Sequence, residues 1–176
     1  MDGSNRVLSK YRWLHEKTKD NCQARDLFIE TLVKLGGQYL IRSEVSTEYD
    51  IKFKYSECKF MANATNDSYD VDIWYPNWYS VNLSDDETCE YVKNLVNDLN
   101  YVCKSKFFYT THKDDNLLRL HSSISFQLVP NIPQIEEFVS EKLNKIIDEQ
   151  HWFIQKMESL IEQVLLSVEH DQEDAS

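Results

Sequence analysis

Apolar and polar residues alternate along the chain with two different periods, and each period predicts a type of element. In residues 22–35 apolar side chains recur every three to four positions, as on one face of a helix, and Gly36 marks the end. In residues 49–55 every second side chain is apolar, which is typical of a strand with one buried face. The expected strands of this first region cover residues 38–46, 49–55, 58–64, 69–75 and 78–83, with a break at Pro76-Asn77.

The second half of the chain repeats both patterns in another order. Ser84, followed three residues later by Glu87, has the spacing of a capping box and predicts a helix over 85–101. A polar cluster at residues 113–116 predicts a turn between two further strands. Those strands are expected at 105–112 and 117–128.

A long helical pattern fills the rest of the chain. No glycine or proline interrupts it after Gln134, and apolar residues recur at steps of three and four, as in a coiled-coil seam. Such a face must be buried, either within the chain or against a partner helix or a second copy, and the pattern favours neither alternative. The candidate partner-binding residues of this seam are Phe153, Met157, Leu160 and Val164.

The order of these elements predicts an α+β fold. We expect a two-layer sandwich, in which helices cover one face of a mostly antiparallel sheet. Residues 22–147 would form one core domain. A helical extension over residues 1–21, containing a helix at 5–20, would precede it, and residues 148–176 would form a C-terminal helical extension with an acidic tail.

Net charge narrows the range of partners. The chain has 176 residues and a formal net charge of −11 at pH 7, which disfavours contact with nucleic-acid phosphates and with anionic membranes. A basic or amphipathic protein segment suits this charge better. No targeting signal and no apolar window of about 20 residues is present, so we expect a cytoplasmic protein.

Residues able to carry enzyme chemistry are sparse. Three glycines are too few for a phosphate-binding loop, and no serine lies in a G-x-S-x-G context. The cysteines are far apart, and a chain of this size does not need disulfides, so we expect reduced thiols. They are Cys22, Cys58, Cys89 and Cys103. We therefore expect no catalytic residues and no cofactor.

The hairpin around residue 115 offers an alternative. His112, Asp114 and His121 are residue types that bind zinc, and they would support a metal-dependent or acid–base hydrolase. No recognised ligand spacing accompanies them, and solvent-exposed histidines beside a polar turn explain the same pattern.

Aromatic residues gather around Pro76. Trp74, Trp78 and Tyr79 could form an exposed patch that binds another protein, or a stacking platform in a small-ligand sensor domain. They could equally be the packed corner of the sheet.

The segment from Val81 to Phe108 is similar to YbjN-like proteins, and the element order resembles the fold of type III secretion chaperones. The similarity lies in the helix start at Ser84, in the helix end Val96-Asn97-Asp98-Leu99-Asn100, and in the lysine-aromatic strand that follows. The resemblance implies a sandwich fold, dimerisation and protein binding without catalysis. We therefore expect a non-enzymatic protein-binding module, chaperone-like or regulatory.

Overall fold

The computed structural model describes residues 23–42, 51–112 and 114–173, and the side chains of residues 23–38, 51–112 and 114–160. The helix expected at 5–20 lies outside these ranges. The elements are α2 (Ala24–Lys34), β1 (Gln38–Arg42), β2 (Ile51–Tyr55), β3 (Cys58–Ala64), β4 (Asp70–Asn82), α3 (Asp86–Val102), β5 (Lys106–His112), β6 (Leu117–Gln127) and α4 (Ile135–Glu173). The α+β class is confirmed.

The described strands form one sheet in the order β1-β2-β3-β4-β6-β5. The pairs β1–β2, β2–β3, β3–β4 and β5–β6 are antiparallel. Ser56 and Glu57 connect β2 to β3 with positive φ angles of 47° and 66°, as a tight two-residue hairpin turn requires. At the other end of the order, β5 pairs with β6 alone and is an edge of the sheet.

The described residues form two compact units. The first unit contains α2, β1, β2, β3, the part of β4 up to Tyr75, and the segment Ile124–Lys142. The second unit contains Pro76–Ser123 and α4 from Leu143 onward. Because β4, β6 and α4 each pass through both units, the boundaries between the units fall inside these elements.

Aromatic side chains make the core of the first unit. Phe28 of α2 lies edge-on to Phe53 of β2, with ring centroids 5.9 Å apart, and Phe53 stacks on Phe60 of β3 at 5.3 Å. All three are buried, and each contributes about 1.5–3 kcal/mol through burial. Gly36 has a φ of 75°, the left-handed conformation that ends the helix as expected.

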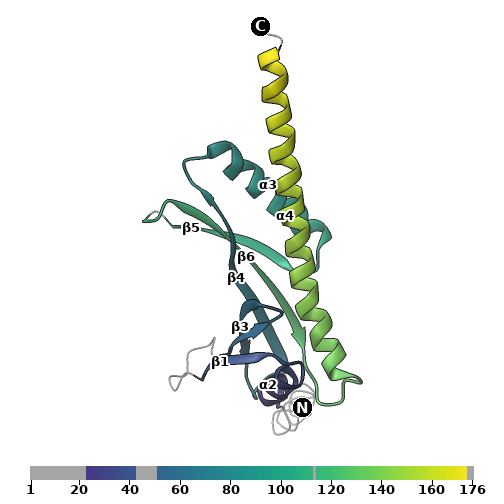
Figure 1. Ribbon diagram of the computed structural model, residues 1–176. Coiled ribbons are helices and arrows are strands. Elements are labelled where there is room, and N and C mark those ends of the chain that lie inside the picture. Colours follow the sequence, from purple (N-terminus) through teal and green to yellow (C-terminus); the bar gives the residue numbers. More distant parts are fainter. Residues whose placement is uncertain (1–22, 43–50, 113, 174–176) are drawn as a thin grey trace, which may run out of the picture. The chain divides into compact units, whose positions relative to one another are not determined.

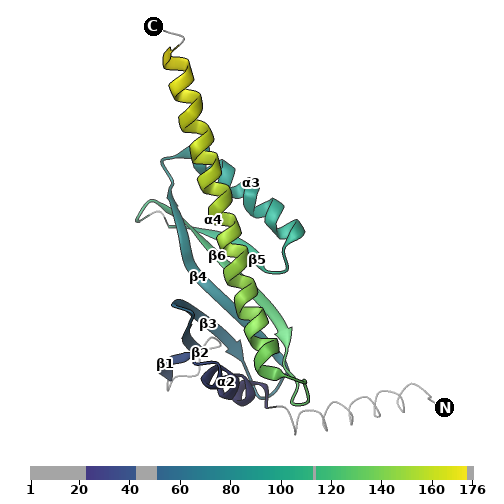
Figure 2. The same ribbon diagram turned by 45° about the vertical axis from the view of Figure 1, so that its right-hand side comes forward.

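The core of the second unit lies between its helices and the β5–β6 hairpin. The buried stripe of α3 packs with Phe107, Leu118 and Leu120 of the hairpin and with Phe153 and Met157 of α4. That stripe consists of Cys89, Val92, Leu95, Val96 and Leu99. Both views show α3 alongside the second-unit part of α4 (Figures 1 and 2).

Strand β4 differs from the expectation at Pro76. The sequence predicted two strands separated there, but β4 continues through the proline to Asn82. Proline removes a donor from a sheet, and this is tolerated because β3 pairs with β4 only as far as Trp74. Asn77 then takes a positive φ of 53°, which disturbs the strand without ending it.

The start of α3 also differs. The cap was expected at Ser84, but it is Asp85, whose carboxylate accepts a hydrogen bond from the Thr88 amide at 3.0 Å. Ser84 instead accepts from the side-chain amide of Asn116 at 2.7 Å. At the other end of α3, the apolar side chain of Val102 is 64% exposed.

Candidate protein-interaction surface

The β5–β6 hairpin is regular, which fixes the direction of every backbone group in β5. The register runs from Lys106 opposite Ser123 to His112 opposite Leu117 without a shift. In an unbroken antiparallel strand, the N–H and C=O groups of successive residues point to alternate sides. The direction of one residue's groups therefore gives the direction of all.

Asn100 of α3 supplies that direction. Its side-chain carbonyl accepts from the Phe107 amide at 2.8 Å, and its side-chain NH2 donates to the Phe107 carbonyl at 2.8 Å. Phe107 thus turns both backbone groups away from β6, and the Asn100 amide occupies the place that a neighbouring strand would take. Asn100 closes the sheet edge at this position.

Beyond Phe107 the edge is open. Tyr109 and Thr111 occupy alternate positions after Phe107 in β5, so their N–H and C=O groups also point away from β6. No described residue is hydrogen bonded to these groups. The Tyr109 side chain is 40% exposed, and Thr110, Thr111 and His112 are exposed. We call the outward backbone groups of Tyr109 and Thr111 the β5 edge.

Exposed apolar side chains follow the residue that closes the edge. Tyr101 is 91% exposed and Val102 is 64% exposed, and both come directly after Asn100 on α3. A tyrosine presents a large apolar ring and a polar tip, which suits protein contacts. The end of α3 and the β5 edge are therefore neighbouring features, joined through the two Asn100 hydrogen bonds.

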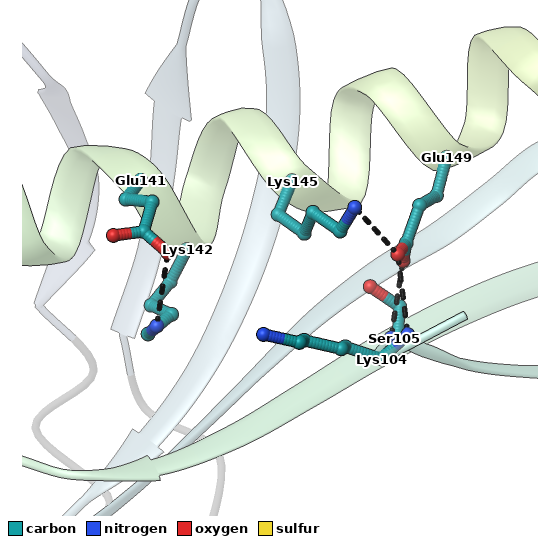
Figure 3. Close-up of polar contacts among 6 residues, drawn as sticks. All are labelled: Lys104, Ser105, Glu141, Lys142, Lys145 and Glu149. Atoms are coloured by element: carbon teal, nitrogen blue, oxygen red, sulfur yellow. Dashed lines mark hydrogen bonds and ion pairs between the residues drawn. The ribbon is translucent and has the colours of Figure 1, made fainter. Parts of the chain in front are cut away.

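The end of α3 is attached to α4 by a buried carboxylate. Glu149 of α4 accepts hydrogen bonds from the amides of Lys104 and Ser105 at 3.2 and 3.0 Å, and Lys145 lies 3.3 Å away (Figure 3). Burial alone would raise the pKa of Glu149. The hydrogen bonds and Lys145 lower it by more than burial raises it, so the net pKa is below its usual value. The charged form of Glu149 thus holds the α3–β5 connection in place.

Two of the predicted seam residues lie inside the second unit. Phe153 and Met157 have almost no exposed surface, so a partner cannot reach them in this conformation. The Phe153 ring lies edge-on to Trp78 at 5.2 Å and to Tyr79 at 5.6 Å. The seam is therefore buried within the chain at these positions, one of the two alternatives that the pattern left open. Leu160 is half-buried, and the side chain of Val164 lies outside the described part, so partner binding there stays a prediction.

The predicted aromatic patch is divided between the two units. Trp74 belongs to the first, whereas Trp78 and Tyr79 are half-buried in the second. Positions 71, 73 and 75 face the core of the first unit, but Trp78, at an even position, packs on Phe107 at 6.1 Å. Tyr79, the next residue, packs in the same core, so the regular alternation of β4 is interrupted after the positive φ at Asn77.

The three hairpin residues proposed for a metal do not form a site. In His121, Nδ1 accepts from the Asn77 amide at 3.3 Å and Nε2 lies 2.8 Å from the Thr110 hydroxyl, so both ring nitrogens are engaged. Burial, followed by His112 and Arg119, lowers the pKa of His121. His112 pairs with Leu117, and Leu117 lies four residues from His121 along β6, or about 13 Å. Among residues 23–42, 51–112 and 114–173, no group of three His, Cys, Asp or Glu side chains is placed to hold a metal.

The cysteines inside the described ranges are free thiols: Cys58, Cys89 and Cys103. Burial raises the pKa of the Cys89 and Cys103 thiols, which keeps them protonated and poorly nucleophilic. Cys22 lies outside the described ranges.

Sequence reasoning missed the contact of Asn100 with the sheet edge. It lies at the end of a helix pattern, seven positions before Phe107, and nothing local marks it as the partner of a strand. The available signals were its polar side chain after the apolar Leu99 and its place in the helix end that is similar to YbjN-like proteins.

Comparisons with known proteins add a fold resemblance. The chain matches no protein-family model, and no curated protein sequence matches it. A solved structure, that of YbjN from E. coli, described as a proposed transcription regulator, is similar with a TM-score of 0.48 and 15% identity, covering 70% of this chain and 86% of that chain. The weak YbjN-like resemblance seen in the sequence is confirmed at the level of the fold. No helix among the described residues is long and apolar enough to cross a membrane.

Proposed function

We propose that this chain is a non-enzymatic protein-binding module, a chaperone-like or regulatory adaptor that receives a partner at the β5 edge. The observation that supports this proposal is the pair of outward-facing residues, Tyr109 and Thr111, whose backbone groups have no partner in the described part of the chain. An added strand would satisfy these groups, and such strand addition is a recurrent way of binding extended protein segments.

The exposed end of α3 supports the same proposal. A strand that pairs with β5 gains hydrogen bonds but little sequence specificity from the backbone alone. Exposed Tyr101 and Val102 are apolar groups beside the closed end of this edge, and they could supply side-chain contacts to the same partner. Neither the hairpin histidines nor the divided aromatic patch offers a comparable basis for a hydrolase or a ligand sensor.

The test is a matched pair of substitutions at Thr111. Thr111→Pro removes the outward N–H and is tolerated at a sheet edge, whereas Thr111→Val keeps the N–H and the strand propensity. The tagged full-length proteins would be used for affinity capture from the native cells, after circular dichroism has shown that each is folded. We expect the same partner to be retained by wild type and Thr111→Val and lost by Thr111→Pro. Equal retention by all three proteins would contradict the proposal.

A further inference from the structure

Helix α4 continues beyond the core that it helps to form. Among the described side chains, Met157 is the last residue of α4 in the core cluster of the second unit, and Leu160 is only half-buried. The helix nevertheless extends to Glu173, which is 16 residues past Met157, or about 24 Å. Both views show α4 continuing past α3 at its C-terminal end (Figures 1 and 2). We call residues 158–173 the distal segment of α4.

The sequence of the distal segment keeps the apolar stripe of α4. A set of apolar residues recurs at steps of one and three positions: Leu160, Ile161, Val164, Leu165 and Val168. Because an α-helix turns once in about 3.6 residues, these positions share one face, to which Phe153 and Met157 also belong. The second unit buries that face at Phe153 and Met157. The stripe continues for about three turns after Met157, and its burial requires a further apolar surface.

The distal segment is acidic along its whole length. It contains five acidic residues and no lysine or arginine. Three of them, Glu158, Glu162 and Glu169, occupy one flank of the stripe, where helices that pack side by side exchange ion pairs. The last lysine of the chain, Lys156, lies over the Trp152 ring at 5.6 Å. Two copies of the distal segment would set one acidic flank against another, and such like charges select against a pair of identical helices.

A basic helix complements both features of the distal segment. An apolar stripe on the partner would cover the leucine, isoleucine and valine positions and exclude water from them. Lysine or arginine beside that stripe would pair with the acidic flank, which gives specificity and fast association more than affinity. An anionic membrane surface also offers apolar contact, but its charge has the same sign as the segment. The chemistry of the segment therefore favours a protein helix with basic flanks.

We infer that the distal segment of α4 is a docking surface for a basic amphipathic helix of another protein. The partner helix packs its apolar residues along the stripe from Leu160 to Val168, and its lysines or arginines face Glu158, Glu162 and Glu169. This surface is separate from the β5 edge, and the inference does not rest on the function proposed for that edge. An adaptor with two separate surfaces can hold two segments at once.

The first test uses two synthetic peptides of about 20 residues, a length at which an isolated helix forms. Both carry the same leucine seam, and the flanking positions are lysine in one peptide and glutamate in the other. Fluorescence anisotropy of each labelled peptide with the full chain should show that the lysine peptide binds about tenfold more tightly or better, with a difference that narrows as salt is added. Equal affinity for the two peptides would overturn the inference.

The second test separates docking on the stripe from general attraction to an acidic protein. Val164→Asp and Gln163→Asp add the same charge at neighbouring positions, but only residue 164 belongs to the stripe. We expect Val164→Asp to weaken binding of the lysine peptide by about tenfold or more, because a charge replaces an apolar contact. Gln163→Asp should bind as wild type does or slightly more tightly. If the two variants bind the peptide equally, the attraction is non-specific and the inference fails.

The third test requires a new binding preference, which a misfolded variant does not give. Glu162→Lys combined with Glu169→Lys reverses the charge of the flank, so this double variant should bind the glutamate peptide more tightly than the lysine peptide. An unchanged preference for the lysine peptide would place the contact elsewhere on the chain and refute the inference.

The outcomes also distinguish this inference from the proposed function and from self-association. Folded Thr111→Pro should bind the lysine peptide as wild type does, whatever its effect on partner capture at the β5 edge. Loss of the peptide in this variant would move the site to that edge, against the inference. If sedimentation equilibrium shows a wild-type dimer that Val164→Asp converts into a monomer, a second copy occupies the distal segment and the inference is wrong.

Discussion

The two units of the chain bury polar groups in different ways. Among the described residues of the first unit, the buried polar residue is Thr31, and its hydroxyl donates to the Leu27 carbonyl at 2.7 Å. In the second unit four buried side-chain atoms have no hydrogen-bond partner among the described residues. They are Trp78 Nε1, Ser105 Oγ, Ser122 Oγ and Gln150 Oε1.

The difference indicates that the second unit gives up stability that the first unit keeps. A buried polar group without a partner costs about 1–3 kcal/mol. The same unit also carries the open β5 edge, the exposed end of α3 and the buried charge of Glu149. Strained or unsatisfied features commonly gather where a protein acts on something else. We therefore expect the second unit to open more readily than the first.

The largest expected effect comes from removing one core aromatic from each unit. Phe28→Ala and Phe153→Ala should each lower the free energy of unfolding by about 3–5 kcal/mol, because both rings are fully buried. Hydrogen exchange followed by mass spectrometry should show faster exchange in α2 and β2 for Phe28→Ala, and in α3 and β5 for Phe153→Ala. If both variants accelerate exchange evenly along the chain, the two units do not differ in local stability.

A smaller effect is expected at the charged contact of the second unit. Glu149→Gln removes the charge that accepts from two backbone amides, and should lower the free energy of unfolding by about 1.5–3 kcal/mol in urea titrations at pH 7. The matched control is Glu141→Gln on the same helix, because Glu141 is exposed and contacts only Lys142 among the described residues. Equal losses in the two variants would show that the buried position of Glu149 is unimportant.

The pH dependence of the same contact has a defined sign. Glu149 has a pKa below the ordinary glutamate value of 4.5, so its stabilisation is fully present above pH 4.5. As the pH falls through the lowered pKa of the folded state, this contribution is lost. The stability difference between wild type and Glu149→Gln should therefore shrink as the pH falls below 4.5, whereas a constant difference would contradict the assigned pKa direction.

The smallest expected effect comes from removing one buried hydroxyl in each unit. The resulting changes in the free energy of unfolding should have opposite signs. Ser122→Ala removes an unpaired buried hydroxyl and should raise the free energy of unfolding by about 1 kcal/mol. Thr31→Ala removes a hydroxyl that is hydrogen bonded, and should lower it by about 1 kcal/mol or more. Thermal melts of both variants at one pH would measure this. Two decreases of similar size would remove the main contrast between the units.

Local periodicity was sufficient for most elements. The sequence predicted helix 22–35 and strand 58–64, and the structure has α2 at Ala24–Lys34 and β3 at Cys58–Ala64. It was wrong at Pro76, because the effect of a proline depends on whether the neighbouring strand reaches it. It also placed the cap of α3 at Ser84 instead of Asp85, because serine and aspartate are both suitable caps. In the structure the Ser84 hydroxyl accepts from Asn116, and Asp85 caps the helix.

The candidate interaction surface was less accessible to prediction. The sequence indicated the apolar seam of α4 at Phe153, but it did not indicate the surface that the seam packs against, because an apolar stripe fits any complementary apolar surface. The openness of β5 depends on the order of strands in the sheet, and no residue within β5 encodes that order. Asn100 became recognisable only when the fold placed its amide against Phe107.

The sequence by itself determined the type and approximate extent of most elements, the acidic charge and the lack of a recognisable catalytic motif, since these depend on residues close together in the chain. Only the tertiary structure decided which aromatic side chains are buried, which strand lies at the edge and which backbone groups stay unpaired. The physical reason is that burial and strand pairing are contacts between residues distant in sequence, and a local pattern does not specify its partner.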